Sequence, residues 1–523
     1  MTVFYDDGEE AAQSDLIAWL ASGAPFGCAP QDVSVISTHA SRIFRGPGRV
    51  LKLKRAVDYG YLNFSTLDRR RASTEAEIRL NRRTAPDLYR GILPVYRGAE
   101  GVGFDACGPV VDYLVELNRF DDGQLLSRIA ADTPARLDRH LMEDLAAAIA
   151  ALHRTGDTKT EAGGAGGMQR TLDGNAAAFA AQPSGLFLPE QLADLQERSQ
   201  AALDQLSPLL EARRVSGQVR ELHGDLHLGN IYLGQDGLPV LFDAIDFDPD
   251  LLSIDRLYDL AFALMDLRHQ GLKTPANILL NRTFDLSDED LGQDAGGLAA
   301  LGFFIACRAA IRAHVTAQAT GGRSDDPRMT DARSYLEEAL SALDPAEPRL
   351  IAIGGLSGSG KSRIAREIAA DLPGVVGARI IRSDVVRKRL FDCPLDQKLE
   401  DAHYGGEATI RTFEQLGREV RAALEAGASV IADAVWLQEA QRAGIEAIAT
   451  DLQIPFTGLW VEAPLAIRME RAASRRRNVS DATAEIAEMQ ENLDPGFHDW
   501  RRVDSSGPKD RTLAKARAEL GLE

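Results

Sequence analysis

The chain has 523 residues, which is too many for one hydrophobic core, so two or three domains are expected. Its 45% hydrophobic and 26% charged residues are typical of a globular protein and exclude a disordered or fibrous one. The formal net charge of −19 argues against a protein that follows long nucleic-acid backbones, because such a surface repels phosphate.

The four cysteines and the apolar stretches bear on location. The cysteines lie far apart and form no C-x-x-C pair, which argues against a disulfide framework or a zinc site and favours a reducing compartment. The N-terminus lacks the basic and then apolar pattern of a signal peptide. No stretch approaches the roughly 18 apolar residues that a membrane helix needs. We therefore expect a cytoplasmic protein that does not enter a membrane.

The first part of the chain mixes strands and helices. A hairpin is expected at 31–57, where two β-rich runs flank a Gly-Pro-Gly turn. The glycine-rich stretch at 161–169 is expected to be a flexible loop. Periodicity and composition predict further elements: short helix 11–20, basic helix 66–84, strand 109–117, helices 134–154 and 189–212, a motif-rich region 219–262, and helices over 296–343.

Residues 223–230 read His-Gly-Asp-Leu-His-Leu-Gly-Asn, and a predicted strand after them ends in Ile-Asp-Phe. Such a set suits phosphoryl transfer: Asp225 would orient and deprotonate an acceptor hydroxyl, while Asn230 and Asp246 would hold Mg²⁺ on a nucleotide. Asp243, three residues earlier in the same predicted strand, is a rival for the second metal position. The bland alternative is that Asp225 only caps a turn.

This loop resembles that of the aminoglycoside phosphotransferase and choline kinase family, which reads HGDxxxxN. The later segment Asp255-Arg-Leu-Tyr-Asp-Leu-Ala resembles the D-x-x-Y-D-L-A segment of that family. The resemblance implies an α+β protein-kinase-like fold with Asp225 as the catalytic base. It also implies that Asp259 braces the catalytic loop.

The same family has a strand lysine that pairs with nucleotide phosphates. Lys52 and Lys54 are two residues apart and share one face of their strand, so periodicity does not separate them. Alignment to the family favours Lys52, with Glu77 or, as second choice, Glu75 as its helical partner. The basic, aromatic segment at 57–71 departs from drug-modifying members, so aminoglycosides are not expected as the natural substrate.

A linker is predicted at 344–348, because the two prolines of Asp-Pro-Ala-Glu-Pro cannot continue a helix. The expected organisation is a kinase-like domain at 1–343, this linker, and a second domain at 349–523. No motif spans the linker, so the halves are expected to be separable there.

The second domain opens with the pattern G-x-x-x-x-G-K-S between an apolar strand and an amphipathic helix. Glycines let backbone amides curl around phosphates, and the helix N-terminus adds its positive dipole end. Lys361 would neutralise β- and γ-phosphate charge, and the Ser362 hydroxyl would ligate Mg²⁺. The nucleotide-binding set is therefore Gly355, Ser357, Gly358, Ser359, Gly360, Lys361 and Ser362.

The rest of this domain alternates strands and helices, which predicts a parallel α/β sheet with ligands at the carboxyl ends of its strands. Asp384 and Asp433 fall at two such ends, where a carboxylate can serve Mg²⁺ or accept a proton. The alternative for both is a helix N-cap. The predicted strands after the first are 377–384, 428–434 and 455–464.

These features resemble the small P-loop kinases related to polynucleotide 5′-kinase, gluconate kinase and zeta-toxin-type sugar kinases. In that group an Asp-x-x-Arg follows the second strand, which implies Asp384 as the base and Arg387 as a ligand of the acceptor. The lid pattern implies Arg471 and Arg475 as phosphate ligands, ahead of Ser-Asp-Ala-Thr at 480–483. Gluconate is not favoured, because the lid lacks the His-Phe of gluconate kinases.

Together the halves resemble bacterial chains described as bifunctional aminoglycoside phosphotransferase/ATP-binding proteins. We expect a bifunctional kinase with one Mg²⁺–ATP site per domain and small hydroxylated, sugar-like or nucleotide-like acceptors. Two alternatives remain open: a regulatory protein in which one domain gates the other or is a pseudokinase, and a nucleic-acid 5′-end kinase. Long nucleic acids are not expected as partners, and the sequence does not indicate an oligomeric state.

Overall fold

The structure is a computed structural model, and it describes residues 13–38, 40–59, 62–287, 293–473, 479–481, 483–494, 496 and 498–522. The chain divides into two compact units, which are described separately. Unit 1 comprises Met1–Leu137, Ala151–Asp266 and Cys307–Ala339, and unit 2 comprises Asp138–Ala150, Leu267–Ala306 and Leu340–Glu523.

An antiparallel sheet of six strands forms the first layer of unit 1. The predicted hairpin is present, because β2 (Ser41–Arg45) pairs antiparallel with β3 (Arg49–Lys54) in the register Ile43↔Lys52. β3 also pairs with β6, so the lysine strand lies inside the sheet rather than at its edge. The strand order is β1-β2-β3-β6-β4-β5, and the other members are β1 (Ser34–Ser37), β4 (Tyr89–Gly98), β5 (Gly101–Gly103) and β6 (Val110–Asn118).

One helix packs on this sheet and positions a buried carboxylate beside β3. It is α2 (Leu67–Asn81), which begins after Thr66, whose side chain accepts a hydrogen bond from the amide of Arg69. Such a cap satisfies an amide that the helix itself cannot pair. Ile78 and the strand residues Val50, Val115 and Leu117 belong to one buried cluster between the helix and the sheet.

The helices predicted at 11–20, 134–154, 189–212 and 296–343 are present, but helical residues at 126–132, 170–180 and 273–285 were not predicted, and one predicted loop is wrong in part. Residues 161–169 are not a loop throughout, because α5 begins at Gly164. Gly163 and Gly164 have positive φ angles of 72° and 59°, and the Glu211 carboxylate accepts the amide of Ala165. Helices in this region are α1 (Ser14–Ala21), α3 (Leu126–Asp132), α4 (Arg139–Thr155), α5 (Gly164–Ala180), α6 (Pro189–Val215), α7 (Pro249–Leu252), α8 (Arg256–His269), α11 (Leu301–Gln318) and α12 (Arg328–Ala342).

Short strands frame the motif region of unit 1. The predicted strand through residue 246 is wrong in its extent, because β9 (Pro239–Leu241) ends before Asp243. Asp243 has a φ of 61°, a left-handed conformation that cannot continue a strand. Asp243 and Asp246 therefore both lie after β9, and their carboxylates point in different directions. The other short strands are β7 (Val219–Glu221), β8 (Ile231–Leu233) and β10 (Ser253–Asp255).

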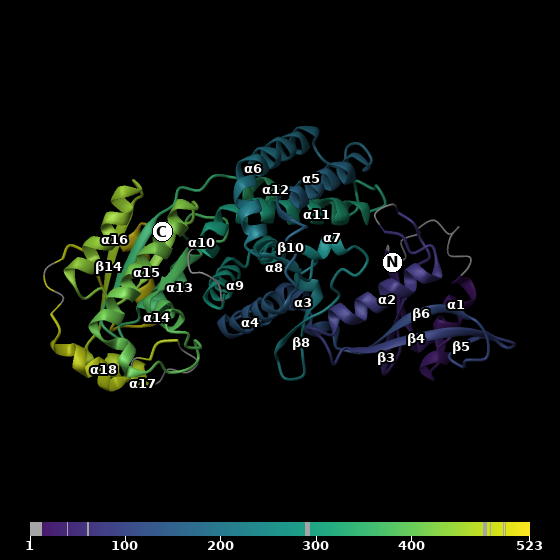
Figure 1. The fold of residues 1–523 in the computed structure, drawn as a ribbon, viewed down its shortest axis with the longest axis horizontal. Coiled ribbons are helices and arrows are strands. Elements are labelled where there is room, and N and C mark those ends of the chain that lie inside the picture. The colour runs from purple at the N-terminus through teal and green to yellow at the C-terminus, as the bar shows by residue number, and fades with distance from the viewer. Residues whose placement is uncertain are drawn as a thin grey trace. The chain divides into compact units, whose positions relative to one another are not determined.

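Unit 2 is built on a parallel sheet of five strands, as predicted, in the order β12-β13-β11-β14-β15. The last strand was not predicted. The strands are β11 (Leu350–Gly354), β12 (Arg379–Arg382), β13 (Val430–Asp433), β14 (Phe456–Glu462) and β15 (Arg501–Asp504). Figure 1 shows the helices around them: α13 (Lys361–Ala369), α14 (Ser383–Leu390), α15 (Gly406–Glu425), α16 (Glu439–Asp451), α17 (Leu465–Ala473) and α18 (Ala484–Met489). The last helix is α19 (Lys509–Leu520).

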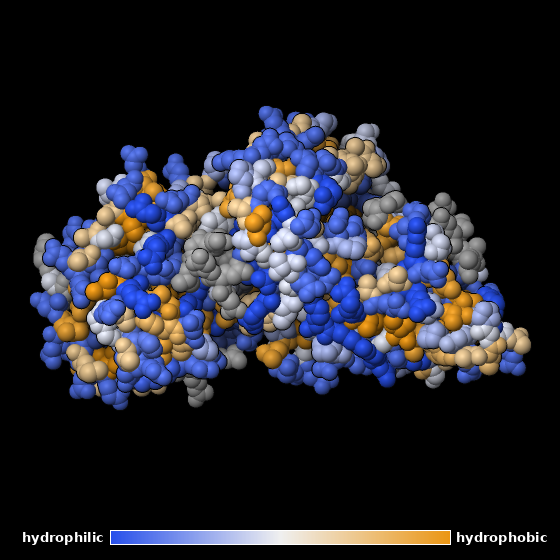
Figure 2. Space-filling view, in the orientation of Figure 1, coloured by the Kyte–Doolittle hydropathy of each residue, from blue (hydrophilic) through white to orange (hydrophobic). Residues whose placement is uncertain are grey.

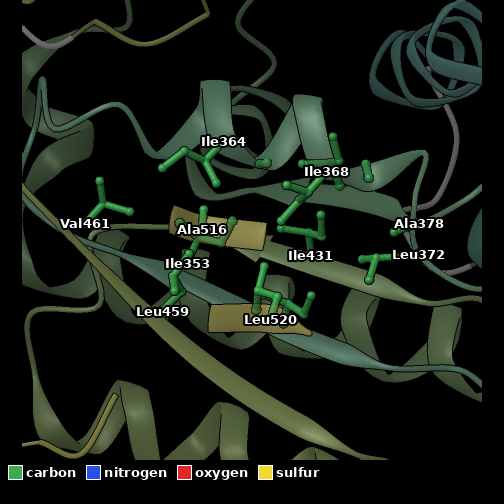
Figure 3. Packing of buried hydrophobic residues seen from close by; sticks show 14 of the residues in the cluster. Ile353, Ile364, Ile368, Leu372, Ala378, Ile431, Leu459, Val461, Ala516 and Leu520 are labelled. Atoms are coloured by element: carbon green, nitrogen blue, oxygen red, sulfur yellow. The ribbon is translucent and has the colours of Figure 1, made fainter. Parts of the chain in front are cut away.

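The core of unit 2 lies between α13 and the sheet. Ile364 and Ile368 of α13 face Ile353 and Ile431 of the central strands (Figure 3), and all four side chains are at most 4% exposed. Each such side chain stabilises the fold by about 1.5–3 kcal/mol. This packing holds the N-terminus of α13 at the carboxyl end of β11, which is where the predicted phosphate loop lies.

A helix from the segment before the linker covers the edge of this sheet. α9 (Lys273–Asp285) packs along β12, the outermost strand. The side-chain amide of Asn281 hydrogen-bonds to the free backbone edge of this strand. Its oxygen accepts a hydrogen bond from the amide of Ile380 at 2.6 Å, and its nitrogen donates to the carbonyl of Ala378 at 3.1 Å. Arg379 forms a buried ion pair with Asp285 at 2.8 Å. A cut at the linker would therefore separate β12 from its cover.

One helical stretch, Ala295–Gln318, is long and apolar enough to be considered as a membrane span, which the sequence analysis did not foresee. It has 24 residues and a mean hydropathy of 1.5, but 67% of it is buried inside the protein, as in the core helix of a globular protein. The visible face of the molecule is largely hydrophilic, with scattered apolar residues (Figure 2).

The buried ion pair on β12 should contribute to stability. We expect Asp285→Ala to lower the free energy of unfolding by about 3 kcal/mol, because it leaves the Arg379 guanidinium buried without its carboxylate. Urea unfolding of the full chain measures the loss. The control is Asp371→Ala, which removes an exposed ion pair with Arg517 and should change stability by less than about 1 kcal/mol. Equal losses in the two variants would contradict the role of this pair.

Candidate active sites

In unit 1, two lysines of β3 share one buried carboxylate of α2. Lys52 Nζ lies 2.9 Å from Glu77 Oε1, and Lys54 Nζ lies 2.7 Å from Glu77 Oε2. Burial alone would raise the pKa of Glu77, but the two lysines hold it well below its usual range. Glu75, the second choice from the sequence, pairs with Arg71 on the exposed face of α2. The structure thus places Glu77 beside both lysines and Glu75 away from them.

Each of the two aspartates after β9 forms an ion pair with a different one of the two lysines. Lys52 Nζ lies 2.6 Å from Asp243 Oδ1, and 42% of the Asp243 side chain is exposed. Asp246 is 6% exposed, pairs with Lys54, and accepts a hydrogen bond from Ser73 Oγ at 2.9 Å. An ion-binding carboxylate needs access, so the geometry favours Asp243 over Asp246, the reverse of the order that the sequence suggested.

A cavity of about 220 Å³ opens beside these groups. Lys52, Glu77, Asn230 and Asp243 line it, as do the polar residues Arg45, Asn118, Arg119 and Asp122. Its walls include apolar residues that the sequence analysis did not name, because they come from a turn after β6 and from strand faces without a motif: Ile43, Val50, Leu117, Phe120, Leu125 and Phe242. An apolar pocket lined by a few polar and charged groups is the usual form of a nucleotide or small-molecule site.

The catalytic-loop residues lie next to this cavity. Asn230 Nδ2 donates to the Asp225 carbonyl at 2.9 Å and to its carboxylate at 3.0 Å, which leaves the amide oxygen of Asn230 available as a ligand. His227 Nε2 lies 3.6 Å from Asp225 Oδ2. Burial would raise the pKa of Asp225, but His227, His223 and Arg308 hold it well below its usual range. Asp225 is therefore a carboxylate ready to accept a hydrogen bond.

The carboxylate of Asp259 supports the catalytic loop. Asp259 of α8 is fully buried and accepts the amide of Gly224 at 3.0 Å and the ring of His153 at 3.0 Å. Gly224 has a φ of 80°, and a Cβ there would lie 3.0 Å from both Ile245 and the carbonyl of Leu251. Only glycine fits this turn without strain. The expectation that Asp259 braces the catalytic loop is confirmed by these contacts.

In unit 2, the phosphate loop joins β11 to α13. Gly355, Gly358 and Gly360 all have positive φ angles, between 84° and 134°. A Cβ on Gly355 would lie 2.2 Å from the Val461 carbonyl, and one on Gly358 would lie 2.4 Å from the Arg468 carbonyl. The loop is thus a tight cradle that only glycine can form at these positions. Lys361 and Ser362 lie in the first turn of α13, and both are partly exposed.

Two arginines of α17 donate hydrogen bonds to backbone carbonyls in and around this loop. Arg471 donates to the Ser359 carbonyl at 3.3 Å and to the Ser505 carbonyl at 2.7 Å. Arg468, which was not singled out, is 2% exposed and donates to the carbonyls of Ala463 and Ala487. The predicted lid residue Arg475 lies outside the described residues.

The predicted carboxylates of unit 2 lie at strand ends, as expected. Asp433 ends β13, is 4% exposed, and has Arg382 Nε 3.6 Å from its carboxylate. Asp384 lies in the first turn of α14, whose N-cap is Arg382 and has no side-chain cap. Asp384 is therefore not the capping residue. One turn later, Arg387 donates to the His403 carbonyl at 2.8 Å and to Thr409 Oγ1 at 3.3 Å, so two of its nitrogens hold the protein itself.

The described part of the lid contacts the segment after α14. Asp481 accepts hydrogen bonds from Lys388 Nζ at 2.9 Å, from the amide of Leu399 at 3.0 Å and from Tyr404 Oη at 2.7 Å. These bonds and Lys388 hold the pKa of Asp481 below its usual range against the opposing effect of burial. Asp481 thus joins the lid to the same helix that carries Asp384.

The comparison with known families finds two separate matches along the chain. Residues 61–295 match the model described as phosphotransferase enzyme family, and residues 350–495 match a model described as AAA domain. The uncharacterised protein Rv2004c of Mycobacterium tuberculosis is 27% identical over 500 residues, covering 92% of this chain and 94% of that protein.

Two further relatives resemble single parts. An adenylyl-sulfate kinase of Myxococcus xanthus is 30% identical over 117 residues, 22% of this chain and 59% of that enzyme. A choline/ethanolamine kinase family protein of Mesorhizobium loti, known as a crystal structure, has 11% identity and a TM-score of 0.36 over 64% of this chain and 99% of its own.

Burial and the charge of Glu77 raise the pKa of Asp246 to about 6, although Lys54 opposes the shift. An unfolded aspartate has a pKa of about 3.9, so between these values the folded chain binds more protons than the unfolded chain, and stability falls as pH rises. We expect the stability of the wild type relative to Asp246→Asn to fall between pH 4 and 6, by at most about 1.4 kcal/mol per pH unit. Urea unfolding at several pH values measures this. A difference that stays constant or rises with pH would contradict it.

Proposed function

We propose that this chain, whose two parts match a phosphotransferase family model and an AAA domain model, is a bifunctional ATP-dependent phosphotransferase. Each domain would hold its own Mg²⁺–ATP and transfer phosphate to its own small hydroxylated acceptor. The observation that supports the proposal is that each unit has its own lysine at a candidate phosphate site: Lys52 beside Glu77 in unit 1, and Lys361 after the glycine cradle in unit 2.

The residues of unit 1 fit a magnesium nucleotide. Asp243 lines the cavity and is partly exposed, and Asn230, whose amide oxygen is available, lines the same cavity. Within the described residues, no group of three or more His, Cys, Asp or Glu could hold a metal ion, so the ion would share its ligands with the phosphates. When bound, Mg²⁺ offsets the negative charge of the transferring phosphate.

Asp225 suits the base in unit 1. Its carboxylate is 39% exposed, and one oxygen accepts a hydrogen bond from Asn230 Nδ2. A hydroxyl that donates to the remaining oxygen would be held in line with the phosphate at the cavity and would lose its proton to Asp225 during transfer. Lys52 would offset the charge of the phosphates of the nucleotide, with Glu77 fixing its side chain.

In unit 2, Asp384 would be the base and Asp433 would act on the metal side, with Lys361 and Ser362 at the phosphates. Arg387 would contribute to acceptor binding chiefly by holding residues 403–409, because its guanidinium donates into that segment. The adenylyl-sulfate kinase match supports an acceptor that carries an anionic group, such as a sugar derivative or a nucleotide. Arg471 would steady the phosphate loop through the Ser359 carbonyl.

The proposal includes a cytoplasmic location. All four cysteines are free in the structure, which suits a reducing compartment. ATP as a donor suits the same compartment.

A second candidate function is gating, in which one part of the chain controls the other. The observation in its favour is the fastening of α9 to β12 through Asn281 and Arg379, since β12 leads directly into the helix of Asp384. The gating model predicts that Asn281→Ala changes the turnover of the P-loop site even where the fold is retained. Unchanged turnover would leave independent catalysis as the account.

Two independent nucleotide sites should be countable. We expect calorimetry with a non-hydrolysable ATP analogue and Mg²⁺ to give two nucleotides per wild-type chain. Lys361→Ala removes a phosphate-neutralising charge from one site, and Asp243→Ala removes a metal ligand from the other, so each variant should bind one. A wild-type count of one, with Asp243→Ala silent, would indicate that unit 1 is a pseudokinase.

Asp225→Asn should separate chemistry from binding. The amide keeps the shape of the side chain but cannot accept a proton, and general-base catalysis contributes about 10²–10⁴-fold. In a Lys361→Ala background, transfer by unit 1 should fall by this factor while nucleotide affinity is retained. Turnover and calorimetry on the same preparation give both values. A fully active variant would reduce Asp225 to a residue that shapes the loop.

A further inference from the structure

A short connecting segment of unit 2, defined as residues 479–481 and 483–492, contacts two sides of the candidate P-loop site. It contains most of the Ser-Asp-Ala-Thr motif at 480–483, which the proposed chemistry does not use. At the end of the motif, the Thr483 hydroxyl accepts a hydrogen bond from the amide of Ile486 and so caps α18. The motif thus fixes the start of a helix, and its aspartate is left for another role.

Asp481 binds the beginning of this segment to α14. Its side chain is 9% exposed, and its oxygens accept hydrogen bonds from Lys388, the amide of Leu399 and the Tyr404 hydroxyl. Lys388 belongs to α14, is 2% exposed, and also donates to two backbone carbonyls. All three hydrogens of its ammonium group are therefore used. The pair is buried and complete, so removing either charge would leave the other without compensation.

An apolar contact supports the same attachment. Val479 is 8% exposed and packs in one cluster with Val385 of α14 and with Leu395. The connecting segment is therefore held to α14 by a buried ion pair and by a buried apolar side chain two residues earlier.

These contacts lie close to Asp384, the proposed base. Lys388 follows Asp384 by four residues on α14, so the two side chains are neighbours on one face of the helix. Tyr404 lies under the guanidinium of Arg387, whose central carbon is 5.1 Å from the ring centre. Burial, Asp481 and the charge of Asp384 raise the pKa of Tyr404 above its usual range. The hydroxyl that Asp481 binds is thus also near the proposed base.

The other end of the connecting segment contacts the phosphate loop. Gln490 Oε1 accepts a hydrogen bond from the amide of Ser357 at 2.8 Å. Arg468 donates to the carbonyls of Ala487 at 3.1 Å and of Ser357 at 3.5 Å, and it forms an ion pair with Glu491. Ser357 belongs to the glycine cradle, so a phosphate that fills the cradle meets residues that are hydrogen-bonded to this segment.

We propose that Asp481 is a positioning residue of the second site, which holds α14, and with it Asp384, in a fixed place relative to the phosphate loop. Through the connecting segment, a nucleotide in the cradle also steadies residues 383–404. The inference rests on the proposed function, because it takes Asp384 as the base and the cradle as the nucleotide site. Its rival is that Asp481 serves the stability of the fold and nothing else.

Amide hydrogen exchange tests the link without an acceptor. The full chain carries Asp243→Ala, which removes a metal ligand of unit 1, and Mg²⁺–ADP is the probe. ADP should slow exchange severalfold both at 355–362 and at 383–404. With Asp481→Asn added, the slowing should persist at 355–362 and be lost at 383–404, because an amide offers one accepting oxygen to three donors. The matched control is Asp371→Asn, which makes the same change in an exposed ion pair and should keep both effects.

The response of the phosphate loop shows in every sample that unit 2 is folded and binds ADP. Slowing at 383–404 that survives Asp481→Asn, or that is absent from the control, would overturn the inference. If Asp481→Asn does not fold, the double variant Lys388→Met/Asp481→Asn is read in its place, because it leaves no unpaired buried charge. A control without slowing at 355–362 would instead count against the proposed function.

Turnover separates positioning from stability. In the same background, we follow the phosphorylated products of a metabolite extract that Asp384→Asn abolishes. Asp481→Asn should lower their rate of formation at saturating ATP about 10–100-fold, since small misplacements cost such factors, with the KM for ATP unchanged. Lys388→Met/Asp481→Asn should stay slow even where its thermal midpoint recovers. Recovery of turnover together with the midpoint would overturn the positioning role. A control chain that forms no such product would count against the proposed function, and the exchange measurement would then decide the link.

Discussion

The Glu77 carboxylate lies fully buried between Lys52 and Lys54, and the arrangement of the first site depends on this one contact. A carboxylate in that environment is tolerated only because two ammonium groups compensate for its desolvation. Its position on α2 fixes where both lysines point. Asp243 and Asp246 then divide between the two lysines, one toward the cavity and one into the protein. Removing Glu77 would leave two buried cations and disturb both aspartates.

The second unit depends on a different constraint, the shape of a backbone. The phosphate cradle exists because three glycines adopt positive φ angles, and at two of them, Gly355 and Gly358, a side chain would collide with the carbonyls of Val461 and Arg468. Packing of α13 on the sheet then fixes the position of Lys361, the first residue of that helix. Arg471, which the sequence suggested as a phosphate ligand, and Arg468 donate to the backbone carbonyls of Ser359 and Ser357 in this loop. Their contribution is to the rigidity of the cradle.

Much of this architecture was predictable from the sequence, because its signals are local. The lysine hairpin, the glycine cradle and the order of strand and helix in unit 2 each follow from a few adjacent residues. The choice between Asp243 and Asp246 was not predictable, since it depends on a left-handed residue that ends β9 early. The glycine-rich start of α5 was predicted to be a loop, because the sequence does not show that a distant carboxylate, Glu211, accepts the amide of Ala165. The contact of α9 with β12 joins segments about a hundred residues apart, and no periodicity records it.

In this proposal, one chain holds two phosphotransferases with different acceptors. The most direct measurement incubates a metabolite extract and ATP with Asp225→Asn, with Asp384→Asn and with the wild type, and identifies new phosphorylated compounds by mass spectrometry. Two product sets are expected, and each should be lost only with its own variant. One product set that disappears in both variants would contradict independent catalysis.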